Sequence, residues 1–215
     1  SIGVTLFPQD GADFESLLQK ADTAMYRAKE AGRNTFRFFD ESMNVEAVER
    51  MVMQNGLRRA IERKEFVLHY QPQMDLITGS IIGAEALIRW NHPDMGIVSP
   101  ARFIPVAEES GLIVQIGEWV MGEACRQAVA WQRAGLPPLS IAVNLSAVQF
   151  KRSDVTQVVS RALQESGLDP GLLELELTES ILIQHVEGVL STLQSLKRLG
   201  VTLSIDDFGT GYSSL

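Results

Sequence analysis

Four acidic or amide side chains stand at matching places in four apolar runs of the sequence. The runs are IIGAEALIRW with Glu85, SIAVNLS with Asn144, LLELELTES with Glu176 and VTLSIDDF with Asp206. Because successive side chains of a β-strand point to opposite faces, each run separates into an aliphatic face and a polar face. The aliphatic rows are Ile141, Val143 and Leu145; Leu173, Leu175 and Leu177; and Val201, Leu203 and Ile205. Oxygen-bearing side chains on neighbouring strands predict a site for divalent cations.

The polar row needs a compensating charge if it is buried, since an unpaired buried carboxylate costs several kcal/mol. Only two basic residues, Arg89 and His69, fall on that face, too few for ion pairing alone. The donors are oxygens, and the histidines His69, His92 and His185 lack metal-ligand spacing. We therefore expect Mg²⁺ or Mn²⁺ rather than zinc. For any one of these acids alone, a solvated or ion-paired side chain is the better explanation.

A second carboxylate follows the first at the end of the last run. Asp206 and Asp207 would diverge within a strand, but at a strand end the chain turns and both can face one rim. Adjacent carboxylates there suit two metal ions that share a ligand. The sequence thus predicts two ions at one site.

The order of the runs predicts an α/β fold with a mainly parallel sheet. Strands alternate with helices from Glu65 onward, which implies parallel pairing with helices over the sheet. The first two strands follow each other without a helix and are expected to be antiparallel. Helices are expected near 101–110, 113–134, 153–166 and 184–199. Residues 1–39 are expected to form a strand, a helix that begins after Asp13 and ends near Gly32, and a strand. A Met-rich connector helix over 41–63, interrupted at Gly56, is expected to follow these residues.

Composition narrows the class of protein. The net charge of −8 argues against binding to a nucleic-acid polymer, because no basic stripe is available for phosphates. The one cysteine, Cys125, lies in an apolar helical pattern and is expected to be a buried, inert thiol. No apolar stretch approaches the roughly 20 residues of a membrane span, and we expect no signal peptide. We expect a cytoplasmic segment, although a parent protein could carry an anchor.

Several motifs in order resemble one known family. EALIRW (85–90), NLS (144–146), ELTES (176–180) and DDFGTGYSSL (206–215) are similar to the EAL-type cyclic di-GMP phosphodiesterases. YQP (70–72) and SPARFIPVAEESGLI (99–113) fit the same pattern. The resemblance covers roughly 57–215 and implies a (β/α)₈ TIM-type barrel with one antiparallel strand. The implied activity is hydrolysis of cyclic di-GMP to linear pGpG with two Mg²⁺ or Mn²⁺ ions.

The resemblance also implies roles for individual residues. The metal ligands would be Glu85, Asn144, Glu176, Asp206 and Asp207, and the catalytic set would be Glu85, Asp206, Asp207 and Glu179. Arg89 would contact a phosphate, for which a guanidinium fork is well shaped, and Gln71 a guanine side of the ligand. Glu179 would anchor the loop at 207–209. An acid at the start of the following helix explains Glu179 equally well.

The N-terminal residues resemble a second family. SIGV and ADTAMYRAKEAGRN (21–34) are similar to the end of a GGDEF, or diguanylate cyclase, domain. Lys29 and Arg33 fall where that family contacts phosphates, and basic residues near a helix C-terminus are an equal explanation. We expect a GGDEF remnant over 1–40, a linker over 41–63 and an EAL domain over 64–215. The signature of the cyclase is missing from the sequence, so synthesis is not predicted.

The expected EAL domain has five of eight barrel strands, so we expect it to be truncated after Leu215 and inactive alone. The resemblance further implies a homodimer through EAL domains and sensor domains upstream in a parent protein. Two other functions stay open. A non-catalytic cyclic di-GMP receptor would have the same fold with a degenerate site, and an unrelated metal-dependent barrel enzyme would act on another small anion.

Overall fold

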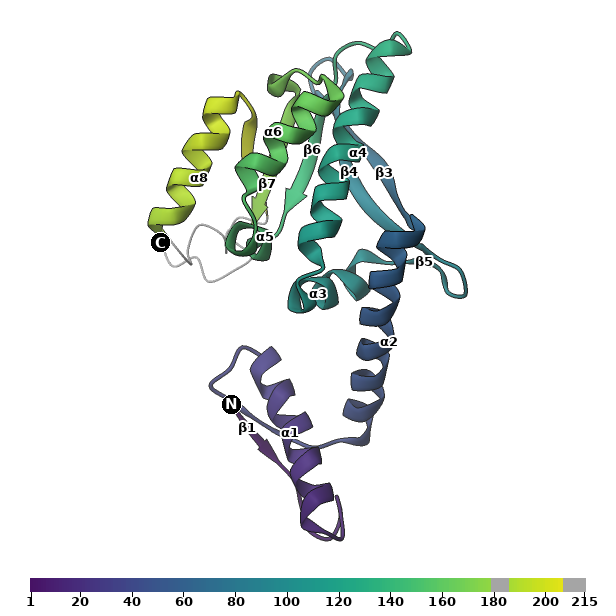
Figure 1. The fold of residues 1–215 in the computed structure, drawn as a ribbon, viewed down its shortest axis with the longest axis vertical. Coiled ribbons are helices and arrows are strands. Elements are labelled where there is room, and N and C mark those ends of the chain that lie inside the picture. The colour runs from purple at the N-terminus through teal and green to yellow at the C-terminus, as the bar shows by residue number, and fades with distance from the viewer. Residues whose placement is uncertain (179–185, 207–215) are drawn as a thin grey trace. The chain divides into compact units, whose positions relative to one another are not determined.

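The computed structural model describes residues 1–178 and 186–206. Of Glu46, Ala47, Val186, Glu187 and Asp206 it describes the backbone alone. The chain divides into two compact units, Ser1–Gly56 and Leu57–Leu215 (Figure 1). The candidate site lies in the second unit.

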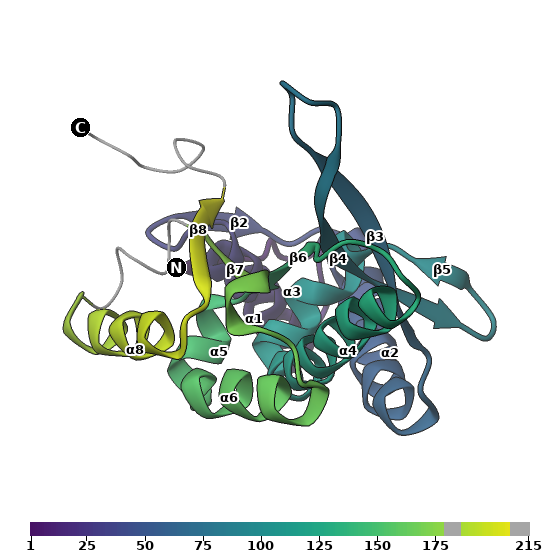
Figure 2. The same cartoon turned by 90° about the horizontal axis from the view of Figure 1, so that it is seen from above.

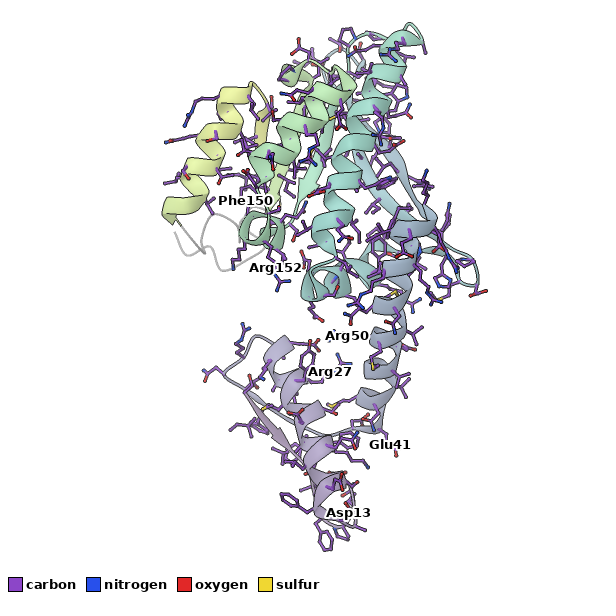
Figure 3. All side chains as sticks on the ribbon, in the orientation of Figure 1. Asp13, Arg27, Glu41, Arg50, Phe150 and Arg152 are labelled. Carbon is purple, nitrogen blue, oxygen red and sulfur yellow. The ribbon has the colours of Figure 1, made fainter. Side chains whose placement is uncertain are left out.

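The N-terminal unit is a strand, a helix and a strand, as the sequence predicts. β1 (Ile2–Val4) and β2 (Phe36–Phe38) pair in parallel, and α1 (Phe14–Glu30) packs against both. Asp13 caps α1 as expected, because its carboxylate accepts a hydrogen bond of 2.8 Å from the backbone N–H of Ser16 (Figure 3). Several large apolar side chains of this unit are exposed: Ile2, Phe7, Phe14, Leu18, Phe36 and Phe38.

The connector helix is not interrupted, so the expected break at Gly56 is wrong. α2 (Glu41–Arg63) runs through Gly56 without a gap. A glycine inside a helix costs only about 1 kcal/mol relative to alanine. The next turn buries Leu57 and Ala60 completely, and burial of one leucine side chain contributes about 2 kcal/mol. The packing of that turn therefore outweighs the local preference of glycine.

The sheet of the second unit is mixed, with one antiparallel pair ahead of parallel strands. Its strands are β3 (Phe66–Met74), β4 (Ile81–His92), β5 (Gly96–Val98), β6 (Ser140–Leu145), β7 (Leu173–Thr178) and β8 (Thr202–Asp206). The order is β3-β4-β6-β7-β8, and β5 pairs with β4 off this path. β3 and β5 are antiparallel to β4, and the pairs β4–β6, β6–β7 and β7–β8 are parallel. This confirms the predicted α/β class and its antiparallel first pair. The short β5 was not predicted, because three residues carry no readable alternation.

Helices cover one face of this sheet. They are α3 (Pro100–Ser110), α4 (Ile113–Arg133), α5 (Ala147–Arg152), α6 (Val155–Ser166) and α8 (Val186–Leu199). α4, α6 and α8 lie side by side over the sheet, as both views show (Figures 1 and 2). The helices expected near 101–110, 113–134 and 153–166 are confirmed, and α8 lies within the fourth expected range. The six-residue α5 was not predicted.

The aliphatic rows form the core between sheet and helices. Seven of the nine predicted side chains are 4 % exposed or less: Ile141, Val143, Leu145, Leu173, Leu175, Leu177 and Val201. Val201, immediately before β8, is buried as predicted, but Ile205 on β8 is 48 % exposed, contrary to the prediction. Within the described residues β8 pairs only with β7, so the end of its aliphatic row has little cover.

An aromatic cluster fixes the start of β3 against β4 and the helices. The ring of Phe66 lies 6.1 Å from Trp90, 5.9 Å from Phe103 and 6.1 Å from Trp119 between centroids. Trp90 is fully buried, and its Nε1 donates a hydrogen bond of 3.0 Å to Glu65 Oε2. The buried indole N–H is therefore satisfied by the carboxylate of Glu65, the residue immediately before β3.

Replacing Trp90 by phenylalanine tests this arrangement. Trp90→Phe removes the donor to Glu65 and part of a filled volume, and we expect the free energy of unfolding to fall by about 3 kcal/mol. Urea unfolding followed by far-UV circular dichroism measures it. Glu65→Gln keeps an acceptor for the indole and serves as the control, with an expected loss of about 1 kcal/mol. An unchanged midpoint in Trp90→Phe would contradict the account of this cluster.

Candidate active site

Strand register brings the predicted site residues to one face of the sheet. Glu85 stands opposite Gln71 on β3 and opposite Ala142 on β6. One step further along the strands, Asn144 stands opposite Glu176, and Glu176 opposite Ser204. The last step pairs Thr178 with the backbone of Asp206. Because partners in register share a face and side chains alternate along a strand, these positions all lie on the face away from the buried aliphatic rows.

A hydrogen bond joins two of the predicted ligands. The amide Nδ2 of Asn144 donates to Glu85 Oε1 at 2.7 Å, across the parallel pair β4–β6. This bond orients the Asn144 amide so that its carbonyl oxygen remains able to accept a donor or to bind a cation. The carboxylate of Glu85 likewise retains acceptor capacity on its second oxygen. The structure thus holds two of the predicted oxygen ligands, from neighbouring strands, together.

The polar face is more exposed than the sequence analysis assumed. Asn144 is exposed, and Glu85 and Glu176 are half-buried. The desolvation cost of a buried carboxylate therefore applies only in part, and the premise of a fully buried acidic row is wrong for the described residues. The remaining reason to expect a cation is the convergence of carboxylate and amide oxygens on one face.

Ser204 carries a buried polar atom that the described residues leave without a hydrogen-bond partner. Its Oγ lies on the same register row as Asn144 and Glu176. Buried hydroxyls without a partner are rare, and ordered water or an ion often satisfies them. The donor types of this face, which are the carboxylates of Glu85 and Glu176, the amide of Asn144 and the hydroxyl of Ser204, fit a Mg²⁺ or Mn²⁺ site in their chemistry.

The predicted ligand set extends past these positions. Within residues 1–178 and 186–206 no three His, Cys, Asp or Glu side chains stand together as metal ligands. The side chain of Asp206 and all of Asp207, both predicted ligands, lie outside the described residues, as do Glu179 and His185. The described part of the site is therefore Glu85, Asn144 and Glu176.

A cavity of about 280 Å³ opens beside these ligands, between the sheet and α3, α4 and α5. From the polar face it is lined by Arg89, Asn144 and Thr178. Arg89 is half-buried, and its Nη1 donates to the backbone carbonyl of Ile88 at 2.8 Å. Ile104, Ile116, Val120 and Leu145 supply much of the apolar wall. The cavity combines a guanidinium, an amide and a hydroxyl with an apolar wall, which suits a polar ligand that carries an apolar surface.

The structure also places five other residues named in the sequence analysis: Gln71, His69, His92, Lys29 and Arg33. Gln71 is exposed on β3 beside Glu85, and His69 is exposed two residues before it. His92 is committed to the hairpin turn, because its Nδ1 accepts from the backbone N–H of Asp94 at 3.1 Å and of Met95 at 3.2 Å. In the N-terminal unit Lys29 lies in the last turn of α1, and Arg33 follows it with a positive φ of 61°.

The sequence analysis gave no individual role to five residues around the site. Glu108 and Gln149 line the cavity together with Ser146, and Thr178 and Ser204 lie on the polar face. One signal was readable: Ser146 followed three residues later by Gln149 is the pattern of a helix capping box. Nothing in the sequence alone pointed to Glu108, because its partner is 38 residues away.

Fold and site together define an α/β protein whose functional side chains gather near the carboxyl ends of parallel strands, as in barrel enzymes. Comparison with protein families then gives the assignment. The EAL domain model matches residues 54–215, and the chain belongs to this family. The model of the diguanylate cyclase GGDEF domain matches residues 1–35, so the end of a GGDEF domain precedes the EAL domain.

Individual relatives agree with this assignment. Over all of its length the chain is 49 % identical to MucR of Pseudomonas aeruginosa, a bifunctional diguanylate cyclase/cyclic di-GMP phosphodiesterase, and covers 31 % of that protein. It is 42 % identical to the cyclic di-GMP phosphodiesterase PdeR of Escherichia coli and covers 32 % of it. The chain thus spans about a third of the length of these relatives. The solved structure of the PaMucR phosphodiesterase in complex with c-di-GMP superposes with a TM-score of 0.72 at 49 % identity, over 75 % of this chain and 66 % of that one.

No described helix has both the length and the apolar character that a membrane crossing requires.

The reactivity of Cys125 tests the prediction that this thiol is buried and inert. The thiol is fully buried, and burial raises its pKa from 9.0 to about 11. At pH 8 the thiolate fraction is then about a hundredfold below that of an ordinary cysteine. We expect the native protein to react with DTNB only over hours and the urea-unfolded protein within minutes. Because the folded pKa is raised, the native rate should increase as pH rises toward 11. Rapid labelling of native protein at pH 8 would show that Cys125 is accessible.

Proposed function

We propose that this chain carries the ligand-binding face of a cyclic di-GMP phosphodiesterase, which hydrolyses cyclic di-GMP to linear pGpG with two Mg²⁺ or Mn²⁺ ions. The observation that carries the proposal is the 2.7 Å hydrogen bond between Asn144 and Glu85 on adjacent parallel strands of an EAL domain. The relatives named above, two of which are phosphodiesterases by name and one of which is solved with c-di-GMP, support the choice of substrate.

The reaction adds water across one phosphodiester. The water oxygen forms a bond to phosphorus, the bond from phosphorus to the ribose 3′ oxygen breaks, and a proton ends on that oxygen. Two divalent cations, when bound, would make the water a stronger nucleophile and offset the charge that develops on the phosphoryl oxygens. Glu85, Asn144, Glu176 and Asp206 would hold the first ion, and Asp206 and Asp207 the second.

Other residues of the chain would bind and orient the substrate. Arg89 lines the cavity beside Asn144 and would place its guanidinium against a phosphate, where two parallel N–H groups match two oxygens. Gln71, exposed opposite Glu85, would donate to or accept from a guanine edge. Glu179 would anchor the loop that follows Asp206. In this proposal the side chains fix the phosphodiester in line with the water.

For the domain organisation we propose a GGDEF portion over 1–40, a connector over 41–63 and an EAL portion over 64–215. The extent of α2, Glu41–Arg63, supports a helical connector. Relatives about three times as long support further domains in the full protein, among them a sensor. A homodimer through the EAL portions is proposed on the resemblance to the family.

Turnover of cyclic di-GMP tests the proposed function. With Mn²⁺, the full-length protein is expected to produce pGpG, measured by HPLC, and Glu85→Ala is expected to lower kcat on the order of 10³-fold because a ligand is lost. Glu118→Ala removes an exposed carboxylate on α4 and is the matched control, expected to keep the activity of the original protein.

Three outcomes would redirect the assignment. Tight binding of cyclic di-GMP without turnover would identify the non-catalytic receptor instead. Hydrolysis of another cyclic dinucleotide in preference to cyclic di-GMP would identify an enzyme with a different substrate. Full activity in Glu85→Ala would contradict the proposed site itself.

A further inference from the structure

The turn that ends β6 is held at Ser146 by three hydrogen bonds that involve a side chain. The hydroxyl of Ser146 donates to Glu108 Oε1 on α3 at 2.5 Å and accepts from the backbone N–H of Val148 at 3.1 Å. The backbone N–H of Ser146 donates to Gln149 Oε1 at 2.8 Å. Ser146 is thus bound both by its own short helix, α5, and by a helix that lies 38 residues earlier in the chain.

Gln149 connects the turn at Ser146 to a third helix, α4. It is 6 % exposed and is the one buried polar side chain among the described residues. Its amide lies directly against Gly117 of α4, where a methyl group would overlap the amide nitrogen. The missing side chain at Gly117 therefore makes the space that lets Gln149 reach back to Ser146.

A second contact ties α5 to the junction of α3 and α4. The guanidinium of Arg152, at the end of α5 (Figure 3), lies over Gly111, where a Cβ would stand 2.5 Å from Nη1. Gly111 ends α3 with a φ of 77°, a conformation that favours glycine. Both ends of α5 are therefore fixed against the α3–α4 pair.

These contacts lie next to a predicted metal ligand. Asn144 precedes Ser146 by two residues, at the end of β6, and the one hydrogen bond recorded for its side chain among the described residues is the bond to Glu85. The direction of the Asn144 amide therefore depends on how the backbone leaves β6. That path is fixed at Ser146.

We propose that Glu108, Gln149 and Gly117 are positioning residues that act through Ser146 to hold Asn144 against Glu85; we call this group the Ser146 clamp. The proposal rests on the proposed function, because it assigns the clamp to the metal site. A purely structural role is the competing explanation. However, α5 contributes a single buried residue, Gln149, so fixing it adds little to the apolar core.

Binding of Mn²⁺ to the full-length protein without substrate tests the clamp, with electron paramagnetic resonance as the readout. Glu108→Ala leaves the Ser146 hydroxyl without its acceptor, and we expect Mn²⁺ affinity to fall ten- to a hundredfold, the usual effect of losing a residue that supports a ligand. Glu108→Gln keeps a carbonyl acceptor and is expected to stay within about threefold of the original protein. Ser146→Ala repeats the loss from the other side if Glu108→Ala does not fold.

The glycine of the clamp has a matched control on the same helix. Gly117→Ala pushes against Gln149 and should weaken Mn²⁺ binding as Glu108→Ala does. In Gly122→Ala the new methyl group meets only the flexible end of Arg126, at 3.4 Å, and Mn²⁺ affinity should not change. Equal affinities in the two alanine variants would contradict a role of Gly117.

A second measurement tests the Ser146 clamp independently of metal binding. The side-chain amide resonances of Asn144 in a ¹⁵N–¹H spectrum, assigned by their loss in Asn144→Ser, report its bond to Glu85. They should shift or broaden in Glu108→Ala and stay in place in Glu108→Gln. If the original protein bound no Mn²⁺, the proposed function would fail while these resonances still decided the clamp. Folded Glu108→Ala with unchanged Asn144 resonances and unchanged Mn²⁺ affinity would overturn the proposal.

Discussion

The register of four parallel strands is the constraint on which the site depends. It places Glu85 one step from Asn144, and Asn144 directly opposite Glu176, so that oxygen atoms from three strands meet on one face. A shift of one residue in any strand would turn its acid toward the helices and its leucine or valine toward solvent. The buried rows on the opposite face, such as Leu173, Leu175 and Leu177, therefore fix the position of the predicted ligands as well as the core.

Helices on the far side of the sheet and the turn after β6 complete that constraint. Strand register alone fixes where a side chain lies along its strand. The backbone can still continue in several directions after the strand ends. Glu108 on α3 and Gln149 on α5 both bind Ser146, and Gly117 on α4 makes room for the second of these bonds. A few polar contacts thus link the packing of three helices to the backbone two residues after Asn144, a predicted ligand.

Much of the fold and part of the site could be predicted from local patterns. Alternation along Leu173–Thr178 and helical spacing in Ile113–Arg133 identified a strand and a helix, because both periods appear over many residues. Prediction failed where tertiary packing decided the outcome, as at Gly56, where burial of the next turn keeps α2 continuous. It also failed for Glu108, whose role comes from a residue far away in the sequence. The exposure of Asn144 was not predictable, since alternation assigns a face but not what covers it.

The central claim is that these oxygen ligands hold paired divalent cations at one place. The most direct measurement is a crystal structure of the full-length protein with Mn²⁺ and cyclic di-GMP, with anomalous scattering recorded at the manganese edge. The account predicts two anomalous peaks beside the polar face, one within about 2.2 Å of oxygen atoms of Glu85, Asn144 and Glu176. Manganese bound elsewhere, or cyclic di-GMP bound with no metal at these residues, would contradict it.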